Sequence, residues 1–153
     1  MRCREFVADL DQRIAHFMSR WGVPGLRLAL AVIFVWFGLL KPLGLSPAEP
    51  LVLATVESLP VFRPATWLIL IGWWEVVIGV TFLHPATIRV AIGLLALQMV
   101  GTFLPLILLP EVTFQSGRVP YGLTMEGQYI IKNLLVIAAA MVIGGTVRRP
   151  DTR

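Results

Sequence analysis

Residues 65–83 read ATWLILIGWWEVVIGVTFL, and Glu75 is the only charged residue among them. Because an α-helix rises about 1.5 Å per residue, a helix over this stretch is roughly 28 Å long, close to the roughly 30 Å thickness of the hydrocarbon core of a bilayer. Long apolar runs of this kind are typical of transmembrane helices. The stretch therefore predicts a membrane-spanning helix with a glutamate buried near its middle.

Three similar runs flank this one, over residues 26–44, 88–109 and 126–147. Of the 153 residues, 57% are hydrophobic and 14% are charged, whereas soluble domains are about 45 to 50% apolar. Pro105 predicts a kink toward the end of the third run. We therefore expect an all-α membrane protein, a four-transmembrane-helix bundle that forms a single membrane domain over residues 1–153 in the lipid bilayer.

Residues 1–22 predict an additional helix before the first span. Charged residues throughout this segment exclude a cleavable signal peptide, and Gly22, Pro24 and Gly25 predict that the helix ends there. We expect an amphipathic helix on the inner membrane surface, with one apolar and one polar face. The apolar face consists of Phe6, Leu10, Ile14, Phe17 and Trp21, and the polar face includes Asp9, Gln12, His16 and Arg20.

The segment between the first two spans, residues 46–60, reads SPAEPLVLATVESLP. Ser46 as N-cap, Pro47 at the first helical position and Glu49 three residues after the cap indicate the start of a helix. The segment is too short to cross a bilayer and too apolar for a solvated loop. We expect a short helix at the outer membrane surface, packed over the mouth of the bundle.

The basic residues predict the orientation of the bundle. In the scheme above nine of the thirteen Lys and Arg residues lie on one side, which makes that side and both termini cytoplasmic. Basic residues at helix ends also account for the net charge of +4 without a nucleic-acid partner. The inner residues are Arg2, Arg4, Arg13, Arg20, Arg27, Arg89, Arg148, Arg149 and Arg153, and the outer ones are Lys41, Arg63, Arg118 and Lys132.

The sequence offers few ligands for an intrinsic cofactor. Cys3 is the only cysteine, which excludes an intrachain disulfide and a thiolate cluster. His16 and His84 fall far from mid-bilayer, where paired haem ligands would have to lie. We therefore expect no metal site and no intrinsic cofactor.

Small residues predict which helix faces pack together. Gly72, Glu75 and Gly79 share one face of the second span, and Ala140 and Gly144 share one face of the fourth. Small residues allow helices to approach closely in a membrane. A compact bundle follows.

Glu75 needs a partner, because an acidic side chain in mid-bilayer is unfavourable by about 2.5 to 3.5 kcal/mol. We expect Lys132 in the fourth span to be that partner, since the two residues lie at similar depths. The other polar candidates are Gln98, Asn133 and Lys41.

Two features of this cluster stay open. Lys41 either extends outward to the membrane surface or, as Gly38 on its face suggests, points into the bundle mouth. Trp73 and Trp74 are either packing residues or the apolar wall of a pocket. The cluster itself is either a brace that fixes helix register or a site for a small polar head group, a quinone or a proton.

The stretches ALAVIFVWFGLLK at 29–41 and TMEGQYIIKNLLVIAAAMVIG at 124–144 resemble DoxX-like membrane proteins, especially the YkgB-type branch associated with resistance to reactive chlorine. The similarity runs from Arg27 to Arg148 and is loosest at 102–111, TFLPLILLPE. The resemblance implies a four-helix protein of the bacterial inner membrane linked to redox or oxidative-stress functions. DoxX-like and DoxD-like proteins are described as membrane parts of oxidoreductase assemblies, including thiosulfate to quinone electron transfer.

Three functions are therefore considered. The first is a quinone-contacting or anchoring subunit of a redox system, in which a soluble or membrane partner protein carries the redox centre and this chain is at most a subunit of the enzyme. The second is a non-catalytic scaffold or assembly protein. The third is a small proton-linked transporter. The sequence also leaves a homo-oligomer open.

Overall fold

The computed structural model describes residues 2–57, 59 and 61–147. This part of the chain is helical, without strands, and an isolated antiparallel bridge joins Phe114 to Leu123. The elements are α1 (Arg2–Leu40), α2 (Glu49–Val56), α3 (Pro64–Leu83), a 3-10 turn η1 (Pro85–Thr87), α4 (Ile88–Phe103), α5 (Pro105–Leu108), α6 (Pro110–Thr113), α7 (Met125–Ile131) and α8 (Asn133–Gly145).

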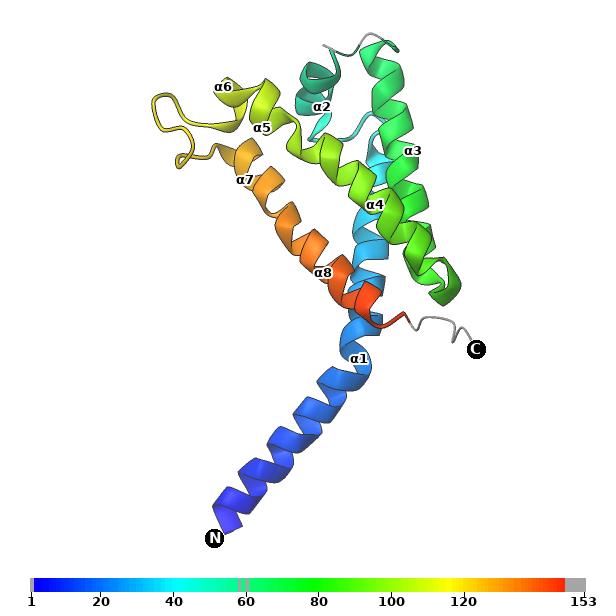
Figure 1. The fold of residues 1–153 in the computed structure, drawn as a ribbon, viewed down its shortest axis with the longest axis vertical. Coiled ribbons are helices and arrows are strands. Elements are labelled where there is room, and N and C mark those ends of the chain that lie inside the picture. Colours follow the sequence, from blue (N-terminus) through cyan, green and yellow to red (C-terminus); the bar gives the residue numbers. More distant parts are fainter. Residues whose placement is uncertain (1, 58, 60, 148–153) are drawn as a thin grey trace, which may run out of the picture.

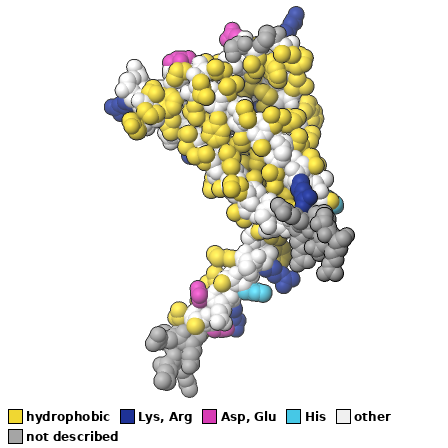
Figure 2. Space-filling view, viewed as in Figure 1, with side chains coloured by type: hydrophobic (Ala, Val, Ile, Leu, Met, Phe, Trp, Pro, Cys, Tyr) yellow, Lys and Arg dark blue, Asp and Glu magenta, His cyan; other side chains and the backbone are white. Residues whose placement is uncertain are grey.

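Four helical stretches in the described part of the chain are long and apolar enough to cross a membrane: Phe6–Leu40, Pro64–Leu83, Pro85–Leu108 and Met125–Gly145. This confirms the predicted all-α, four-helix membrane protein. The space-filling view shows hydrophobic side chains over most of the visible bundle face (Figure 2), as expected for a surface in contact with lipid.

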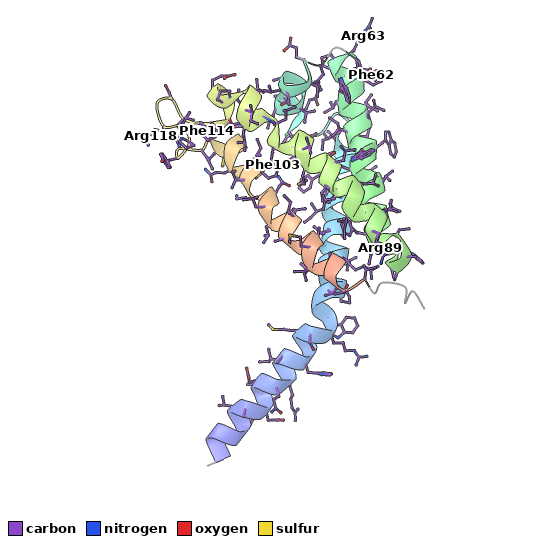
Figure 3. All side chains as sticks on the ribbon, in the orientation of Figure 1. Phe62, Arg63, Arg89, Phe103, Phe114 and Arg118 are labelled. Carbon is purple, nitrogen blue, oxygen red and sulfur yellow. The ribbon has the colours of Figure 1, made fainter. Side chains whose placement is uncertain are left out.

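The two ends of the bundle can be told apart by their arginine residues. Arg63 and Arg118 lie at one end and Arg89 at the other (Figure 3). We call these the Arg63 end and the Arg89 end. α1 begins and α8 finishes on the Arg89 side (Figure 1), while α2 and α6 lie at the Arg63 end.

The most extensive helix contact joins α1 to α3 and depends on glycine. A Cβ atom on Gly72 would lie 2.8 Å from the carbonyl oxygen of Gly38, and one on Gly79 would lie 2.8 Å from that of Ala31. Both distances are too short for a side chain, so the backbones touch directly. The predicted small-residue face of α3 is therefore a contact face, and its partner is α1.

The Arg89 end is filled by hydrocarbon. Ile78, Phe82 and Ile143 are fully buried there. Arg27 closes this end: its Nε donates to the carbonyl oxygen of Phe82 at 3.1 Å and its Nη2 to that of Leu83 at 2.7 Å. A cation at the last carbonyls of a helix satisfies acceptors that have no partner within the helix.

The predicted end of the N-terminal helix is wrong. α1 continues without interruption through Gly22, Pro24 and Gly25 into the first span, and its first half projects beyond the bundle (Figure 1). Proline removes one backbone hydrogen bond but is tolerated in a helix that tertiary contacts support. Here Val23 and Leu26 provide such contacts, because both pack against the buried core.

The ends of other helices differ from their predicted positions by fewer residues. α2 begins at Glu49, with Ala48 rather than Ser46 as its N-cap, and α1 finishes at Leu40 rather than near residue 44. The predicted interruption near Pro105 is present between α4 and α5. The fourth span, expected to be one helix, is interrupted at Lys132 between α7 and α8.

Candidate functional site

Glu75 of α3 has hydrogen-bond partners on both carboxylate oxygens. The Nζ atom of Lys41 donates to Oε2 and forms an ion pair with it. The Nε2 atom of Gln98 in α4 donates to Oε1 at 3.0 Å. The side chains of Lys41 and Glu75 are only 6% and 13% exposed. The pair is therefore shielded from solvent and held in a fixed arrangement by a third helix.

Lys41 reaches Glu75 because α1 and α3 touch. It follows directly after the last residue of α1, and its Cβ lies 2.9 Å from where a Cβ of Gly72 would be. Gly72 precedes Glu75 by three residues, which places both on the same face of α3. The absence of a side chain at Gly72 lets the Lys41 stem cross α3 and deliver its ammonium group to the carboxylate.

The ion pair forms part of the wall of a cavity of about 350 Å³ at the Arg63 end. Helix α2 provides an apolar cover over it, while α3, α4, α5, α7 and the start of α8 provide the sides. The lining residues include Lys41, Glu75, Gln98, Thr102 and Asn133 among the polar ones, and Leu51, Val52, Val56, Ile71, Leu97, Leu104, Pro105 and Ile130 among the apolar ones. The predicted packing of a short helix over the bundle mouth is confirmed.

Some polar groups of this wall make no hydrogen bond to the described residues. The indole Nε1 of Trp67, which lines the cavity, is buried and lacks a partner. Asn133 uses its Nδ2 to donate to the carbonyl oxygens of Tyr129 at 3.0 Å and Ile130 at 3.2 Å, so its Oδ1 is left to accept. The wall thus offers an acceptor at Asn133, while the indole N–H of Trp67 is buried behind the cavity surface.

Two helix interruptions border the cavity. At Leu104 the span changes from α4 to α5, and at Lys132 from α7 to α8. Irregular backbone is tolerated inside a membrane where it lines a cavity or is buried in protein. The bonds of Asn133 to the carbonyl oxygens of Tyr129 and Ile130 compensate the second interruption.

We infer from exposed lining residues that the cavity opens sideways, between α4 and α7. Leu97 and Tyr129 line it and are each 62% exposed. Gly101, one turn after Leu97, also lines it, and a Cβ atom added to Gly101 would meet no atom within 4 Å. Since Leu97 lies well inside a membrane-spanning stretch, this opening faces the lipid.

The structure brings four predicted residues together, namely Glu75, Gln98, Lys41 and Asn133. The expected pairing of Glu75 with Lys132 is wrong, because Lys41 occupies that place. Lys132 is exposed, and its Nζ lies 5.2 Å from the ring centroid of Tyr129. The side chain lies between α7 and α8 and contacts Tyr129 rather than Glu75.

The predicted tryptophan wall also differs. Trp73 is 52% exposed and Trp74 packs against the buried core, and neither lines the cavity. The tryptophan that does so is Trp67, which lies eight residues before Glu75. Residues eight apart fall within one broad stripe of a helix, and this signal could have identified it.

Comparisons of the chain with protein-family models, with curated proteins and with solved structures found no match. The proposed function therefore depends on the residues that line the cavity. Within the described residues no group of three or more His, Cys, Asp or Glu side chains could hold a metal ion.

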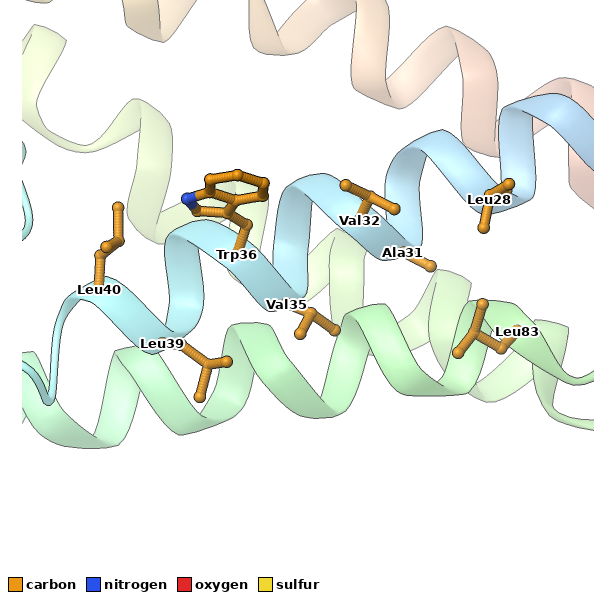
Figure 4. A pocket seen from close by; sticks show the side chains of 8 residues that line it. All are labelled: Leu28, Ala31, Val32, Val35, Trp36, Leu39, Leu40 and Leu83. Carbon is orange, nitrogen blue, oxygen red and sulfur yellow. The ribbon is translucent and has the colours of Figure 1, made fainter.

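A second hollow lies on the outer side of α1, facing away from the Glu75 cavity. Its volume is about 520 Å³, and Leu83 of α3 borders it opposite α1 (Figure 4). Its side chains are aliphatic apart from the Trp36 ring. They can pack against an apolar group, but they cannot transfer a proton or bind an ion. The residues from α1 are Leu28, Ala31, Val32, Val35, Trp36, Leu39 and Leu40.

Proposed function

We propose that this chain is a membrane subunit that binds the polar head of a lipid-soluble molecule in the Glu75 cavity, with a quinone as the first candidate. The observation that carries the proposal is the combination of a buried ion pair, an apolar cover and a lateral opening between α4 and α7. Small-molecule sites are typically cavities of about 300 to 1,000 Å³ with apolar walls and a few polar groups. The 350 Å³ cavity falls within this range.

The polar groups suit a head group with carbonyl or hydroxyl oxygens. The ammonium of Lys41 has three donor hydrogens, of which Glu75 and the carbonyl oxygen of Phe37 at 3.4 Å occupy two. A carbonyl oxygen of the ligand can accept from the third. A ligand hydroxyl can donate to Oδ1 of Asn133, so the same wall can hold the oxidised and the reduced form of a quinone.

The opening suits a ligand that arrives from the bilayer. Leu97 and Tyr129 offer an apolar and an amphipathic side chain at its rim. An isoprenoid or acyl tail can pass between them into the surrounding lipid, while the head group lies against Glu75 and Lys41. A water-soluble substrate would have to enter under α2, which covers the Arg63 end.

A redox or oxidative-stress role extends this proposal. The resemblance to DoxX-like proteins supports it and favours a bacterial inner membrane. The distribution of basic residues favours a cytoplasmic Arg89 end. The electron-transferring group would belong to a soluble or membrane partner protein. In this role the chain holds or anchors the quinone.

The test measures retained quinone in a matched pair of variants. The full chain is purified in lipid nanodiscs, supplied with ubiquinone or menaquinone, passed through a sizing column and extracted for mass spectrometry. Gly101→Leu places a side chain in the opening, whereas Gly93→Leu adds the same side chain to α4 where, as at Gly101, no atom lies within 4 Å of the added Cβ. Gly93 does not line the cavity.

We expect the unmodified chain and Gly93→Leu to retain quinone and Gly101→Leu to retain about tenfold less, which corresponds to about 1.4 kcal/mol of binding free energy. The proposal fails if the unmodified chain neither co-purifies with quinone nor gains it on addition. Equal retention by the two variants would contradict the lateral route.

A scaffold function is the second candidate. The exposed apolar face of the first half of α1 favours it, because that face lies outside the bundle and is free to contact another protein. Transport is favoured less: between the Glu75 cavity and the Arg89 end the interior is filled by Phe34, Ile78 and Phe82. These apolar side chains separate the cavity from the Arg89 end.

A further inference from the structure

The first half of α1 exposes an apolar stripe that the bundle does not cover. α1 has 39 residues, and only its second half packs against α3 and α8. Exposed contiguous apolar surfaces of this kind usually mark an interaction site. The exposed residues of the stripe are Phe6, Val7, Leu10, Ile14, Phe17, Met18 and Trp21.

The spacing within the stripe is that of a coiled coil. Val7, Leu10, Ile14, Phe17 and Trp21 follow one another at intervals of three, four, three and four residues. Such a 3.5-residue repeat keeps one seam of a helix facing a second helix. Val7 and Ile14 are β-branched and alternate with Leu10, an arrangement that favours two parallel strands.

The stripe continues into the membrane-spanning half of α1. Leu28 lies seven residues after Trp21, and Val32 and Leu39 are themselves seven residues apart. All three are exposed and line the second hollow. Figure 4 shows this row along α1, with Leu83 of α3 on the other side of the hollow. After Leu28 the heptad positions Ala31 and Gly38 pack against α3 instead. The heptad seam therefore runs from Val7 to Leu28, and Val32 and Leu39 form an exposed apolar row beyond it.

We infer that the heptad seam is the interface between two copies of the chain, which pack α1 against α1 from Val7 to Leu28. Two copies inserted in the same direction are related by a two-fold axis along the membrane normal, so their α1 helices are parallel. This is the orientation that the repeat favours.

The continuity of α1 favours a second copy over the membrane surface as the occupant. A helix that lies flat on the membrane must turn sharply where the span begins. α1 bends where it leaves the bundle (Figure 1) but stays helical through Pro24 and still projects away from the bundle, and Leu28 beyond Pro24 keeps the heptad register of Val7, Ile14 and Trp21. The face therefore extends the lipid-facing side of the span outward along α1.

Cysteine crosslinking in native membranes tests the inference. Cys3 is first replaced by serine, and single cysteines are introduced by Leu10→Cys, Ile14→Cys and Leu28→Cys on the seam. The matched controls are Ala8→Cys and Ala15→Cys on the other face of the same helix. The membranes are oxidised with copper phenanthroline and analysed without reductant.

We expect a band at twice the chain mass of 17.0 kDa for the seam positions. Because seam residues meet across a two-fold axis, its yield should be at least about fivefold higher than at the control positions. Equal yields at all positions, no band of dimer mass, or bands only of other masses would overturn the inference.

A second measurement does not depend on disulfide formation. Ile14→Glu puts a charge into the seam, and Ala15→Glu puts the same charge on the polar face. Both lie outside the bundle, so both proteins should insert and purify normally. Native mass spectrometry should show dimers for Ala15→Glu and a loss of about tenfold in dimer affinity for Ile14→Glu. Equal dimer fractions in the two variants would contradict the interface.

Discussion

The two ends of the bundle are built in different ways. The Arg63 end holds a cavity, a three-residue polar network and two interrupted spans, whereas the Arg89 end is a dry core of Ile78, Phe82 and Ile143. Stability at the Arg89 end depends on the volume of the core side chains, because a close-packed hydrocarbon core tolerates substitutions that conserve this volume. Stability at the Arg63 end depends on specific partners, because buried polar groups are unfavourable when unpaired.

The strongest test of this difference replaces one side chain of the polar network and one of the hydrocarbon core by methionine. Lys41→Met keeps most of the side-chain volume but leaves Glu75 buried without its ion-pair partner, and we expect a loss of about 3 to 5 kcal/mol in the free energy of unfolding. Leu95→Met in the core should cost less than about 1.5 kcal/mol. Unfolding of the purified chain in mixed SDS micelles measures both.

Two controls belong to this comparison. The double variant Lys41→Met with Glu75→Leu removes both charges and should recover most of the loss, because hydrophobic replacements of buried ion pairs are often neutral. Lys132→Met should have an effect below about 1 kcal/mol, since charges outside a buried pair contribute little. If Lys132→Met were the more damaging change, the observed pairing would be wrong.

A smaller effect is expected from Gln98→Leu. This change removes the hydrogen bond from Nε2 of Gln98 to Glu75 but leaves the ion pair in place. Hydrogen bonds to charged groups contribute about 1.5 to 3 kcal/mol, so the same unfolding measurement should show a loss in this range. A loss as large as that of Lys41→Met would mean that the amide, rather than the ammonium, is the main partner.

The glycine contact gives the next test. Gly72→Ala forces a Cβ atom to within 2.8 Å of a backbone oxygen of α1, and overpacking of this kind costs about 1 to 3 kcal/mol. Gly93→Ala meets no atom within 4 Å and should be neutral or slightly stabilising, because alanine favours helix. Equal unfolding free energies for the two variants would show that α1 and α3 are less tightly packed than the structure indicates.

The smallest effect on stability concerns tryptophan. Trp67→Phe removes a buried N–H group that has no partner among the described residues, so the free energy of unfolding of the empty protein should change by less than about 1 kcal/mol. Retention of added quinone should nevertheless fall, since a smaller ring changes the shape of the cavity wall. Trp73→Phe, on the lipid-facing side, should alter neither quantity, and a matching fall in that variant would exclude a specific role for Trp67.

Much of this architecture could be predicted from the sequence. The length of the apolar runs defines the spans, and the helical spacing of Gly72, Glu75 and Gly79 identifies the contact face of α3. The position of Gln98 near mid-span already suggested a place near Glu75. These features are local or periodic, so they follow from the chain itself.

The partner of Glu75 could not be predicted in the same way. Depth along a helix places Lys132 near the carboxylate, but depth says nothing about which way the side chain points once the helix breaks at that residue. The useful signal was Gly38, three residues before Lys41, because it allows α1 to lie directly on α3. The course of α1 through Pro24 was missed for a related reason, since contacts of Val23 and Leu26 outweigh the local preference of proline and glycine.

The two interrupted spans have a consequence for motion. The segment from Pro105 to Ile131 lies between the breaks at Leu104 and Lys132 and is tied together internally: the Thr124 hydroxyl donates to the carbonyl oxygen of Val112 at 2.7 Å, and Gly127 lies directly against the carbonyl oxygen of Thr113. The α1–α3 pair, in contrast, is joined backbone to backbone. We therefore expect a ligand that widens the opening to swing α5, α6 and α7 as one cap about two hinges, while the helix that carries Glu75 stays still.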